Sequence, residues 1–430
     1  MKRISKQFPI NNADEFKKKL LQFTQQFREI TYLENNEHQA KYSTFDAVFA
    51  FDALTTLQTD AFQGFDKLKE YQNQLNDWLF GYLSYDLKND VEAISSNNFD
   101  GLEFPDLFFF QPKKIIFVSD TFADFHYLNM CDDELDSDFK EIIDITLSED
   151  LTHSEIIIKE RISKNAYLSK VEKVKEHIQR GDIYEANFCM EFYAANAIIN
   201  PTSIFDKLNA ISRPPFASFL KNNKHFLMSA SPERYIKKVG NKIISQPIKG
   251  TAKRGQDKEE DAVLIQNLRT NPKERAENIM IVDLVRNDLS KTASKGSVEV
   301  EELCQIYTFD QVHQMISTIV SQVDEVINVV DILKTTFPMG SMTGAPKLSA
   351  MQIIEKLEET KRGLYSGAVG YFTPANDFDF NVVIRSILYN LDEKYVSFSV
   401  GSAITSEAIP ENEYDECLLK AAAMKKVLNL

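Results

Sequence analysis

TNPKERAENIMIVDLVRND, residues 270–288, is the segment from which we interpret the rest of the sequence. Asn271 can cap the N-terminus of a helix, and Pro272 fits its first turn. Glu274 and Glu277 are three residues apart, so they share one face of this helix. A series of apolar residues predicts that another flank is buried. The series is Ala276, Ile279, Met280, Val282 and Leu284.

A second acidic pair lies near the C-terminus, in ENEYDECLLKAAAMKKVL, residues 411–428. Glu413 and Glu416 repeat the helical spacing, and Lys420 follows one turn later. Adjacent carboxylates repel, and solvent, Lys or Arg, or a hard divalent cation relieves that repulsion. Two acidic helix faces can therefore close on one ion, although such a pair is more often a solvated surface. The predicted packing side is Tyr414, Cys417, Leu418 and Ala421.

Composition indicates a globular protein of two or three domains. The chain has 430 residues, of which 43% are hydrophobic and 26% charged. A formal net charge of -15 argues against a nucleic-acid partner, whose phosphate backbone requires a basic surface. An anionic ligand needs a locally positive or metal-assisted pocket.

The sequence predicts a cytoplasmic protein without a membrane partner. Its first residues, MKRISKQFPINNADEF, lack an apolar signal-peptide core. No later run approaches the ~18 apolar residues of a transmembrane helix. The four cysteines are far apart and form no CxxC, so we expect neither disulfides nor a zinc site. They are Cys131, Cys189, Cys304 and Cys417.

We predict an N-terminal part, residues 1–150, and a catalytic part, residues 151–430. Aromatic and β-branched content predicts buried strands at 78–87 and 106–120. The acidic stretch 131–150 is the candidate linker. Ten of the fourteen glycines lie from Gly240 onward, which places the tight turns and close backbone approaches of a site in the C-terminal half.

The start of the catalytic part has clear local signals. An amphipathic helix follows Ser163 and ends at Gly181, and residues 182–194 predict a strand. GSMTGAPK, residues 340–347, opens another helix but does not fit the Walker A pattern. Its free amides can hold a carboxylate. A strand at 380–390 carries Arg385.

Six motifs in this order resemble the chorismate-binding enzymes, the family of anthranilate synthase component I, aminodeoxychorismate synthase component I, and the isochorismate and salicylate synthases. The likeness is dense over residues 165–428 and weaker before. It implies an α+β fold in which two large, mainly antiparallel sheets pack face to face with helices outside. The motifs are SPER (231–234), PIKGT (247–251), KERAENIMIVDLVRND (273–288), GSMTGAPK (340–347), YSGAVGY (365–371) and EYDECLLKA (413–421).

The resemblance implies a Mg²⁺ ion between the two acidic helices. Glu277 and Glu416 match its direct ligands, and Glu274 and Glu413 match the supporting pair. Chorismate is a dianion, so its ring carboxylate can enter an acidic cage only if a metal reverses the local charge.

The resemblance also implies contacts to both carboxylates of chorismate. Gly250, Thr251 and Gly401 match residues that hold the ring carboxylate, and Lys420 adds positive charge there. The family has a Gly at Ala403, where this chain departs from the pattern.

Four further positions match ligand contacts. Tyr365 and Arg385 match residues that grip the enolpyruvyl carboxylate, a task suited to a planar bidentate guanidinium. His313 and Thr343 match other ligand-side positions. Taken singly, an edge-strand Arg, a core Tyr and a surface His are the more common explanations of Arg385, Tyr365 and His313.

Lys249 distinguishes the members of the family. Anthranilate synthases typically have Ala in PIAGT, whereas PIKGT resembles aminodeoxychorismate synthases. A neutral lysine amine can attack C2 and expel the C4 hydroxyl, after which ammonia adds at C4 and releases the lysine. Its pKa must then fall from about 10.4 toward 7–8. We expect burial behind Pro247 and Ile248, with Lys253, Arg254 and the implied Mg²⁺ nearby, to lower it; the alternative is a turn lysine.

Two acidic residues complete the implied site. Glu233 resembles the general acid that protonates the departing hydroxyl, which requires a raised pKa; the alternative is an ion pair with Arg234 or another base. Glu185 occupies a position where water-adding members have Lys and aminating members usually have Gln. The missing Lys argues against isochorismate or salicylate synthesis.

We therefore predict aminodeoxychorismate synthase component I, which aminates chorismate on the route to 4-aminobenzoate and folate. Nothing in the chain resembles a glutaminase, so ammonia is expected from a separate glutamine amidotransferase subunit. The alternatives are anthranilate synthase component I and, from another class, a non-catalytic chorismate-binding regulatory subunit.

Overall fold

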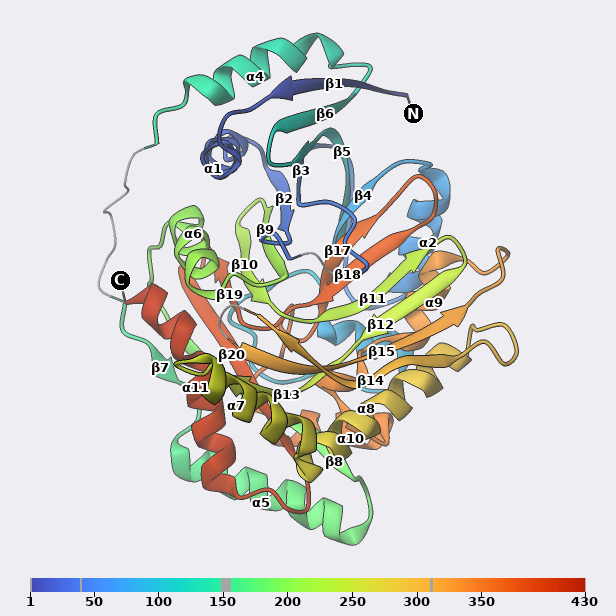
Figure 1. Ribbon diagram of the computed structural model, residues 1–430, viewed down its shortest axis with the longest axis vertical. Helices are drawn as coiled ribbons and strands as arrows, with labels where there is room; N and C mark the ends of the chain where they lie inside the picture. The colour runs from blue at the N-terminus through green and yellow to red at the C-terminus, as the bar shows by residue number, and fades with distance from the viewer. Residues whose placement is uncertain (1, 39–40, 148–155, 310–311, 430) are drawn as a thin grey trace.

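The computed structural model describes residues 2–38, 41–147, 156–309 and 312–429 (Figure 1). Helices surround strands that pair in antiparallel ladders, so the predicted α+β class is confirmed. The strands form one continuous ladder that divides into two arms at β5 (Leu107–Val118). β5 pairs with β3 on one side and with β4 and β6 on the other.

The first arm runs from β3 to β8, with two short strands at its far edge. In spatial order it contains β3 (Ala47–Thr59), β2 (Glu29–Glu34), β9 (Phe216–Asn222), β10 (His225–Ser231), β19 (Ser386–Asn390), β20 (Tyr395–Ile404) and β8 (Glu185–Ala194), followed by β7 (Lys159–Glu160) and β16 (Gly344–Ala345). A side extension contains β6 (Phe122–Leu128) and β1 (Arg3–Pro9).

The second arm begins at β4 and ends at β15, which has neighbours on both edges. It contains β4 (Leu79–Leu83), β17 (Ala368–Phe372), β18 (Phe378–Val382), β11 (Arg234–Val239), β12 (Lys242–Gln246) and β15 (Val312–Gln322), with β13 (Ile248–Lys253) and β14 (Glu299–Thr308) beside β15.

The two arms pack face to face, because one apolar cluster draws side chains from both, among them Val48 and Leu388 from the first arm and Phe80 and Tyr371 from the second. Burial of such side chains is the main force holding the layers together. The outer face of the first arm is covered by α1 (Ala13–Thr24), α4 (Leu135–Asp144), α5 (Lys164–Arg180), α6 (Pro201–Ser212), α10 (Lys347–Leu357) and α11 (Pro410–Leu428). The outer face of the second is covered by α2 (Gly64–Gln74), α8 (Pro272–Ser290) and α9 (Val329–Thr336).

Strands from both sides of residue 150 share ladders. β2 pairs with β9, and β4 pairs with β17. The candidate linker 131–150 is wrong over its first part, where α4 buries Leu135 and Ile142 in the core. Its remaining residues, from 148, lie outside the described residues.

Local predictions in the catalytic part are largely confirmed. α5 begins after Ser163, whose hydroxyl accepts a hydrogen bond from the Ala166 amide, and ends at Gly181 with φ +84°. The predicted strand 380–390 is instead two strands, β18 and β19, separated at Arg385.

The Asn271 cap of α8 is confirmed, because its side chain accepts hydrogen bonds from the Lys273 and Glu274 amides. The predicted buried flank is partly wrong: Ala276 and Ile279 are exposed. The side that packs on the sheet carries Glu277, Asn278, Ile281, Val282, Val285 and Leu289. The acidic residue Glu277 is therefore on the buried side of the helix.

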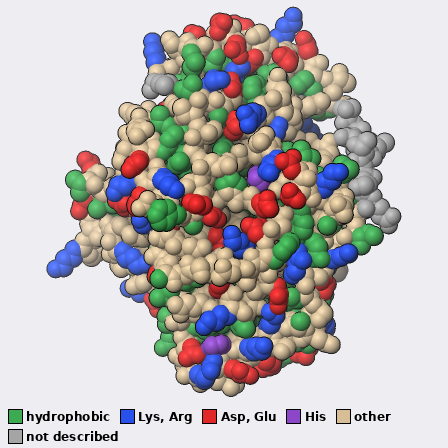
Figure 2. Space-filling view, turned by 180° about the vertical axis from the view of Figure 1, so that it is seen from behind, with side chains coloured by type: hydrophobic (Ala, Val, Ile, Leu, Met, Phe, Trp, Pro, Cys, Tyr) green, Lys and Arg blue, Asp and Glu red, His purple; other side chains and the backbone are tan. Residues whose placement is uncertain are grey.

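On the face shown in Figure 2, Lys and Arg are interspersed with Asp and Glu among the described residues. No helix in the described ranges is both long enough and apolar enough to cross a bilayer.

Candidate functional site

Lys249 lies at an irregularity of β13. The register between β13 and β15 shifts between Ile248 and Thr251, and Gly250 has φ +99°, which favours glycine. Such bulges turn a side chain away from the regular alternation of a strand. The Asn278 amide of α8 donates to the Lys249 carbonyl oxygen at 3.3 Å, which ties this bulge to the helix that carries Glu277.

The Lys249 ammonium is paired with Glu185. Its Nζ donates to Glu185 Oε1 at 2.9 Å, and the exposed fractions of the two side chains are 15% and 2%. Burial alone favours the neutral amine, but the Glu185 and Glu277 carboxylates outweigh it and hold the pKa of Lys249 above its ordinary value. The side chains of the protein, without the Mg²⁺ that the prediction includes, therefore do not lower this pKa. Lys253 extends into solvent, and Arg254 pairs with Asp261.

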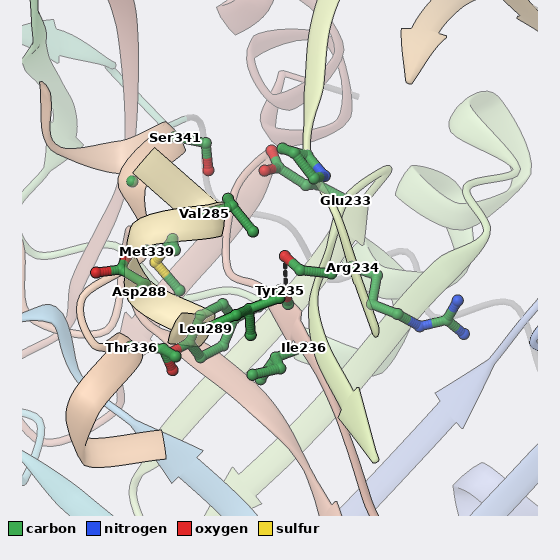
Figure 3. Close-up of a pocket in the computed structure, with 13 residues that line it drawn as sticks. Glu233, Arg234, Tyr235, Ile236, Val285, Asp288, Leu289, Thr336, Met339 and Ser341 are labelled. Atoms are coloured by element: carbon green, nitrogen blue, oxygen red, sulfur yellow. Dashed lines mark hydrogen bonds between the residues drawn. The ribbon is translucent and has the colours of Figure 1, made fainter. Parts of the chain in front are cut away.

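Glu233 is buried between β10 and β11, beside a small cavity of about 20 Å³ (Figure 3). Burial raises the pKa of Glu233 to about 7, against the opposing effects of the Ser341 hydroxyl and the Lys249 charge. Arg234 points away from Glu233 (Figure 3) and pairs with Asp379 at 3.0 Å. The alternative of an ion pair between Glu233 and Arg234 is wrong, and a carboxyl with a pKa near 7 can hold a proton near neutral pH.

Carboxylates from α8 and α11 face a common ammonium group. Lys273 Nζ lies 3.9 Å from Glu277 Oε1 and 3.7 Å from Glu413 Oε1. Burial, together with Glu185 and Glu274, raises the pKa of Glu277 to about 7, and burial together with Glu416 raises the pKa of Glu413. The two acidic helices thus converge, as the sequence predicted.

The other two predicted residues, Glu274 of the supporting pair and Glu416 of the direct ligands, lie beside Glu277 and Glu413. Glu274 Oε2 is 3.1 Å from the position that a Cβ on Gly250 would occupy, so it packs against the bulge of β13. Glu416 Oε1 is 2.5 Å from Lys420 Nζ. Burial alone would raise the pKa of Glu416, but Lys420 and other lysines outweigh it and lower that pKa.

The donor set fits Mg²⁺ in its chemistry. All four predicted ligands offer carboxylate oxygens, which hard divalent cations prefer. Glu277 Oε1 is also buried without a hydrogen-bond partner, although the Lys273 ammonium lies 3.9 Å away. Within the described residues, no three His, Cys, Asp or Glu side chains already form a metal-binding group. Lysines currently lie beside these carboxylates.

Arg385 lies at the break between β18 and β19, with φ +53°. A left-handed backbone at a non-glycine residue is strained and is often found at functional sites. Burial lowers the pKa of Arg385, and Tyr365 and Glu416 oppose this effect. In the described part of the chain, no hydrogen bond or ion pair engages its guanidinium. An unpartnered, half-buried guanidinium is suited to bind an incoming carboxylate.

Tyr365 is buried, with its hydroxyl oxygen 3.8 Å from Cys189 Sγ. Cys189 pairs with Gly401 across β8 and β20, and a Cβ on Gly401 would lie 2.6 Å from the Cys189 sulfur. Lys420 Nζ donates to the Gly401 carbonyl oxygen at 2.8 Å. These predicted substrate residues therefore adjoin one another, and Ala403 lies two residues further along β20.

Thr251, Thr343 and His313 are placed differently. Thr251 is exposed. The Thr343 hydroxyl donates to the carbonyl oxygens of its own turn, at 3.3 Å from Met339 and 3.2 Å from Gly340. His313 is fully buried, which excludes the surface alternative, and its Nε2 lies 2.8 Å from Asp261 Oδ1. Its other ring nitrogen contacts the Thr308 hydroxyl. Both Thr343 and His313 thus already have partners within the chain.

Comparison with known proteins identifies the family to which this site belongs. The chain matches the family described as chorismate binding enzyme over residues 15–426. The protein is a member of the chorismate-binding enzymes. It is 33% identical to aminodeoxychorismate synthase component 1 of Bacillus subtilis over 362 residues, which span 81% of this chain and 76% of that protein. It is 31% identical to anthranilate synthase component 1 of Lactococcus lactis, over 81% of this chain and 78% of that protein.

A solved structure supports the fold. Anthranilate synthase component I of Streptococcus pneumoniae superposes with a TM-score of 0.77 at 24% identity, covering 90% of this chain and 94% of that one. At this identity the likeness concerns the fold alone. The α+β architecture with face-to-face antiparallel layers is thus common to this chorismate-binding enzyme and to a solved relative.

The sequence did not reveal the role of Glu185 in this chorismate-binding enzyme. The family pattern marked Glu185 as a departure, but nothing local connects it with Lys249, which lies 64 residues away. The only signal was an acidic residue at the start of a buried, mostly apolar strand. The four cysteines, in contrast, are free and buried, which agrees with the structural role expected for them.

Proposed function

We propose that this enzyme aminates chorismate at C4 to give 4-amino-4-deoxychorismate, as component 1 of an aminodeoxychorismate synthase. The observation that carries this proposal is the position of Lys249. Its amine is buried at a bulge between acidic helices, near Glu233, and is not a solvated turn lysine. Relatives named aminodeoxychorismate synthase component 1, in Bacillus subtilis and Escherichia coli, support the same assignment.

In the proposed reaction, neutral Lys249 attacks C2 of the ring and the C2–N bond forms. Both ring double bonds shift and the C4–O bond breaks, and Glu233 donates its proton so that the hydroxyl leaves as water. Ammonia then attacks C4, both double bonds shift back, and the C2–N electron pair returns to Lys249. Glu233, now a carboxylate, accepts a proton from the new ammonium group. The net change is chorismate and ammonia to 4-amino-4-deoxychorismate and water.

The remaining residues bind the two carboxylates of chorismate. Arg385 and Tyr365 would hold the enolpyruvyl carboxylate, and the region of Gly250, Gly401 and Lys420 would hold the ring carboxylate. Mg²⁺ held by Glu277 and Glu416, with Glu274 and Glu413 in support, would supply the positive charge that lets a dianion approach an acidic site.

The ammonia would come from a separate glutamine amidotransferase subunit, since the relatives are named component 1. We place the reaction in the cytoplasm, as a step toward 4-aminobenzoate and folate. The second candidate is anthranilate synthase, because proteins of that name are similarly related to this chain.

The test is product identification by mass spectrometry after incubation with chorismate, Mg²⁺ and ammonium. We expect aminodeoxychorismate in the wild type and at least a 10³-fold loss in Lys249→Met, on the order expected when a nucleophile is removed. Lys253→Met is the matched control, because Lys253 is on the same strand and its side chain is 75% exposed. Fluorescent anthranilate as the main product, or full turnover by Lys249→Met, would refute the proposal.

A further inference from the structure

We propose that Glu185 is the proton acceptor that makes Lys249 nucleophilic, so that the proton that Lys249 must lose before each turnover stays inside the site. This inference rests on the proposed function, because it concerns the amine that attacks the ring. It assigns a role to a residue that departs from the usual Gln of aminating relatives.

Geometry is the first support. Among the described residues, Glu185 Oε1 is the one group that accepts a hydrogen bond from Lys249 Nζ, at 2.9 Å. Glu185 is nearly inaccessible, and its other oxygen, Oε2, is buried with no hydrogen-bond partner. A buried oxygen without a hydrogen bond costs roughly 1–3 kcal/mol. Transfer of a proton from Lys249 would turn the buried ion pair into two neutral groups.

The second support is that Glu185 is fixed in place. It is the first residue of β8, paired with Ala345 of β16, and the Tyr184 amide donates to the Ala345 carbonyl oxygen at 2.6 Å. Gly344 allows this close approach, because any Cβ there would lie 2.2 Å from the Glu185 carbonyl oxygen. The carboxylate therefore has little freedom to leave the amine.

The proton step balances within the pair. The Lys249 ammonium gives one proton to the Glu185 carboxylate, and a neutral amine faces a neutral acid. Low polarity disfavours both charged partners, so excluding water brings the ion pair closer in energy to the neutral pair. When the C2–N bond breaks at the end of turnover, Lys249 can take the proton back from Glu185.

Other ionisable groups face the pair from every neighbouring element. Glu277 lies on α8, Glu416 on α11 and Glu233 between β10 and β11, and each acts electrostatically on Lys249 or feels its charge. None of these three carboxylates contacts Lys249 Nζ within hydrogen-bonding distance in the described structure. They set the background charge, whereas Glu185 alone is in position to take the proton.

The main experiment compares wild type with Glu185→Gln from pH 6 to 9. In the wild type, the active form of the Lys249–Glu185 pair carries one proton, which can lie on either side chain. The pair therefore does not have to release a proton to solvent before the reaction. In Glu185→Gln, Lys249 must lose its proton to water before it reacts. We expect kcat/KM to fall about 10²-fold at pH 7 and the deficit to shrink by up to about 10-fold per pH unit. Dividing the kcat/KM of the wild type by that of Glu185→Gln at each pH cancels the titration of Glu233, which both enzymes contain.

A deficit that does not change with pH, or no deficit at all, would overturn the proposal. Glu185→Asp keeps a carboxylate and is expected to lose rate without the added pH dependence. Glu185→Ala should be rescued by formate with saturating kinetics, a response that a structural defect would not show. If formate does not rescue Glu185→Ala and the ratio of kcat/KM between wild type and Glu185→Gln does not change with pH, Glu185 does not transfer the proton.

A second readout needs no turnover. Acetic anhydride labels neutral amines, and peptide mass spectrometry reports the fraction of Lys249 labelled at each pH in substrate-free protein. We expect the labelling midpoint to drop by at least one pH unit in Glu185→Gln, while Lys253 is unchanged. An unchanged midpoint would show that the pair does not exist in solution. If wild type makes no aminodeoxychorismate, the proposed function fails; if it does and the pH ratio is flat, only the role of Glu185 fails.

Discussion

Gly344→Ala tests the close approach that positions β8 at the site. Gly344 has φ +155°, and an added Cβ would lie 2.2 Å from the Glu185 carbonyl oxygen, 2.9 Å from Ala186 Cα and 2.9 Å from Ala350 Cβ. Two of these three atoms belong to the backbone or its Cα, which cannot rotate away as a long side chain can. The short β16–β8 ladder must therefore separate or shift.

The expected cost has two parts. A backbone conformation that L residues avoid costs about 1–3 kcal/mol, and overpacking a filled contact costs about 1–3 kcal/mol. We expect the free energy of unfolding to fall by about 4 kcal/mol, a large share of the roughly 5–15 kcal/mol typical of folded proteins. Because the shift acts on Glu185, turnover should fall as well.

Gly240→Ala is the control. Gly240 has φ +56° in the turn between β11 and β12, and no atom lies within 4 Å of the position of an added Cβ. The free energy of unfolding of Gly240→Ala should fall by only about 1 kcal/mol, because only backbone strain contributes. Urea unfolding followed by the fluorescence of the single tryptophan, Trp78, gives both values. Equal losses in the two variants would refute the close contact between Gly344 and β8.

Four further outcomes can be measured. Because burial raises the pKa of Glu233 to about 7, turnover should decline as pH rises above 7. The same raised pKa means that the free energy of unfolding decreases as the pH rises from about 4.5 to 7, by roughly 3 kcal/mol for this group. Urea unfolding at pH 5 and at pH 8 should therefore show a smaller difference in Glu233→Gln than in wild type. Arg385→Met should raise the free energy of unfolding by about 1 kcal/mol, since it removes a half-buried charge that has no partner among the described residues. It should also raise the KM for chorismate at least 10-fold. A variant that is both less stable and kinetically normal would contradict this. Ellman's reagent should react with none of the four buried thiols in the native protein and with all four in urea, and rapid reaction in the native state would contradict their burial.

Local patterns in the sequence were sufficient for several elements. The caps at Asn271, Ser163 and Gly181 mark the helix ends correctly, because capping depends on residues three or four positions apart. Helical spacing also placed Glu274 and Glu277 on one helix. The same periodicity misjudged the buried flank of α8, since apolar residues lie on more than one side and only the sheet beneath selects between them.

The sequence by itself determined the family, the α+β class and the ionisable groups that the site contains. Only the tertiary structure decided how those groups are paired. Glu185 and Lys249 meet because β16 holds the start of β8 against the bulge of β13, and Arg234 is drawn to Asp379 and away from Glu233. A pKa depends on the charges within a few ångströms and on exclusion of water. Those conditions arise from contacts between segments far apart in the chain, so the charge state of the Lys249 amine cannot be predicted from its neighbours in sequence.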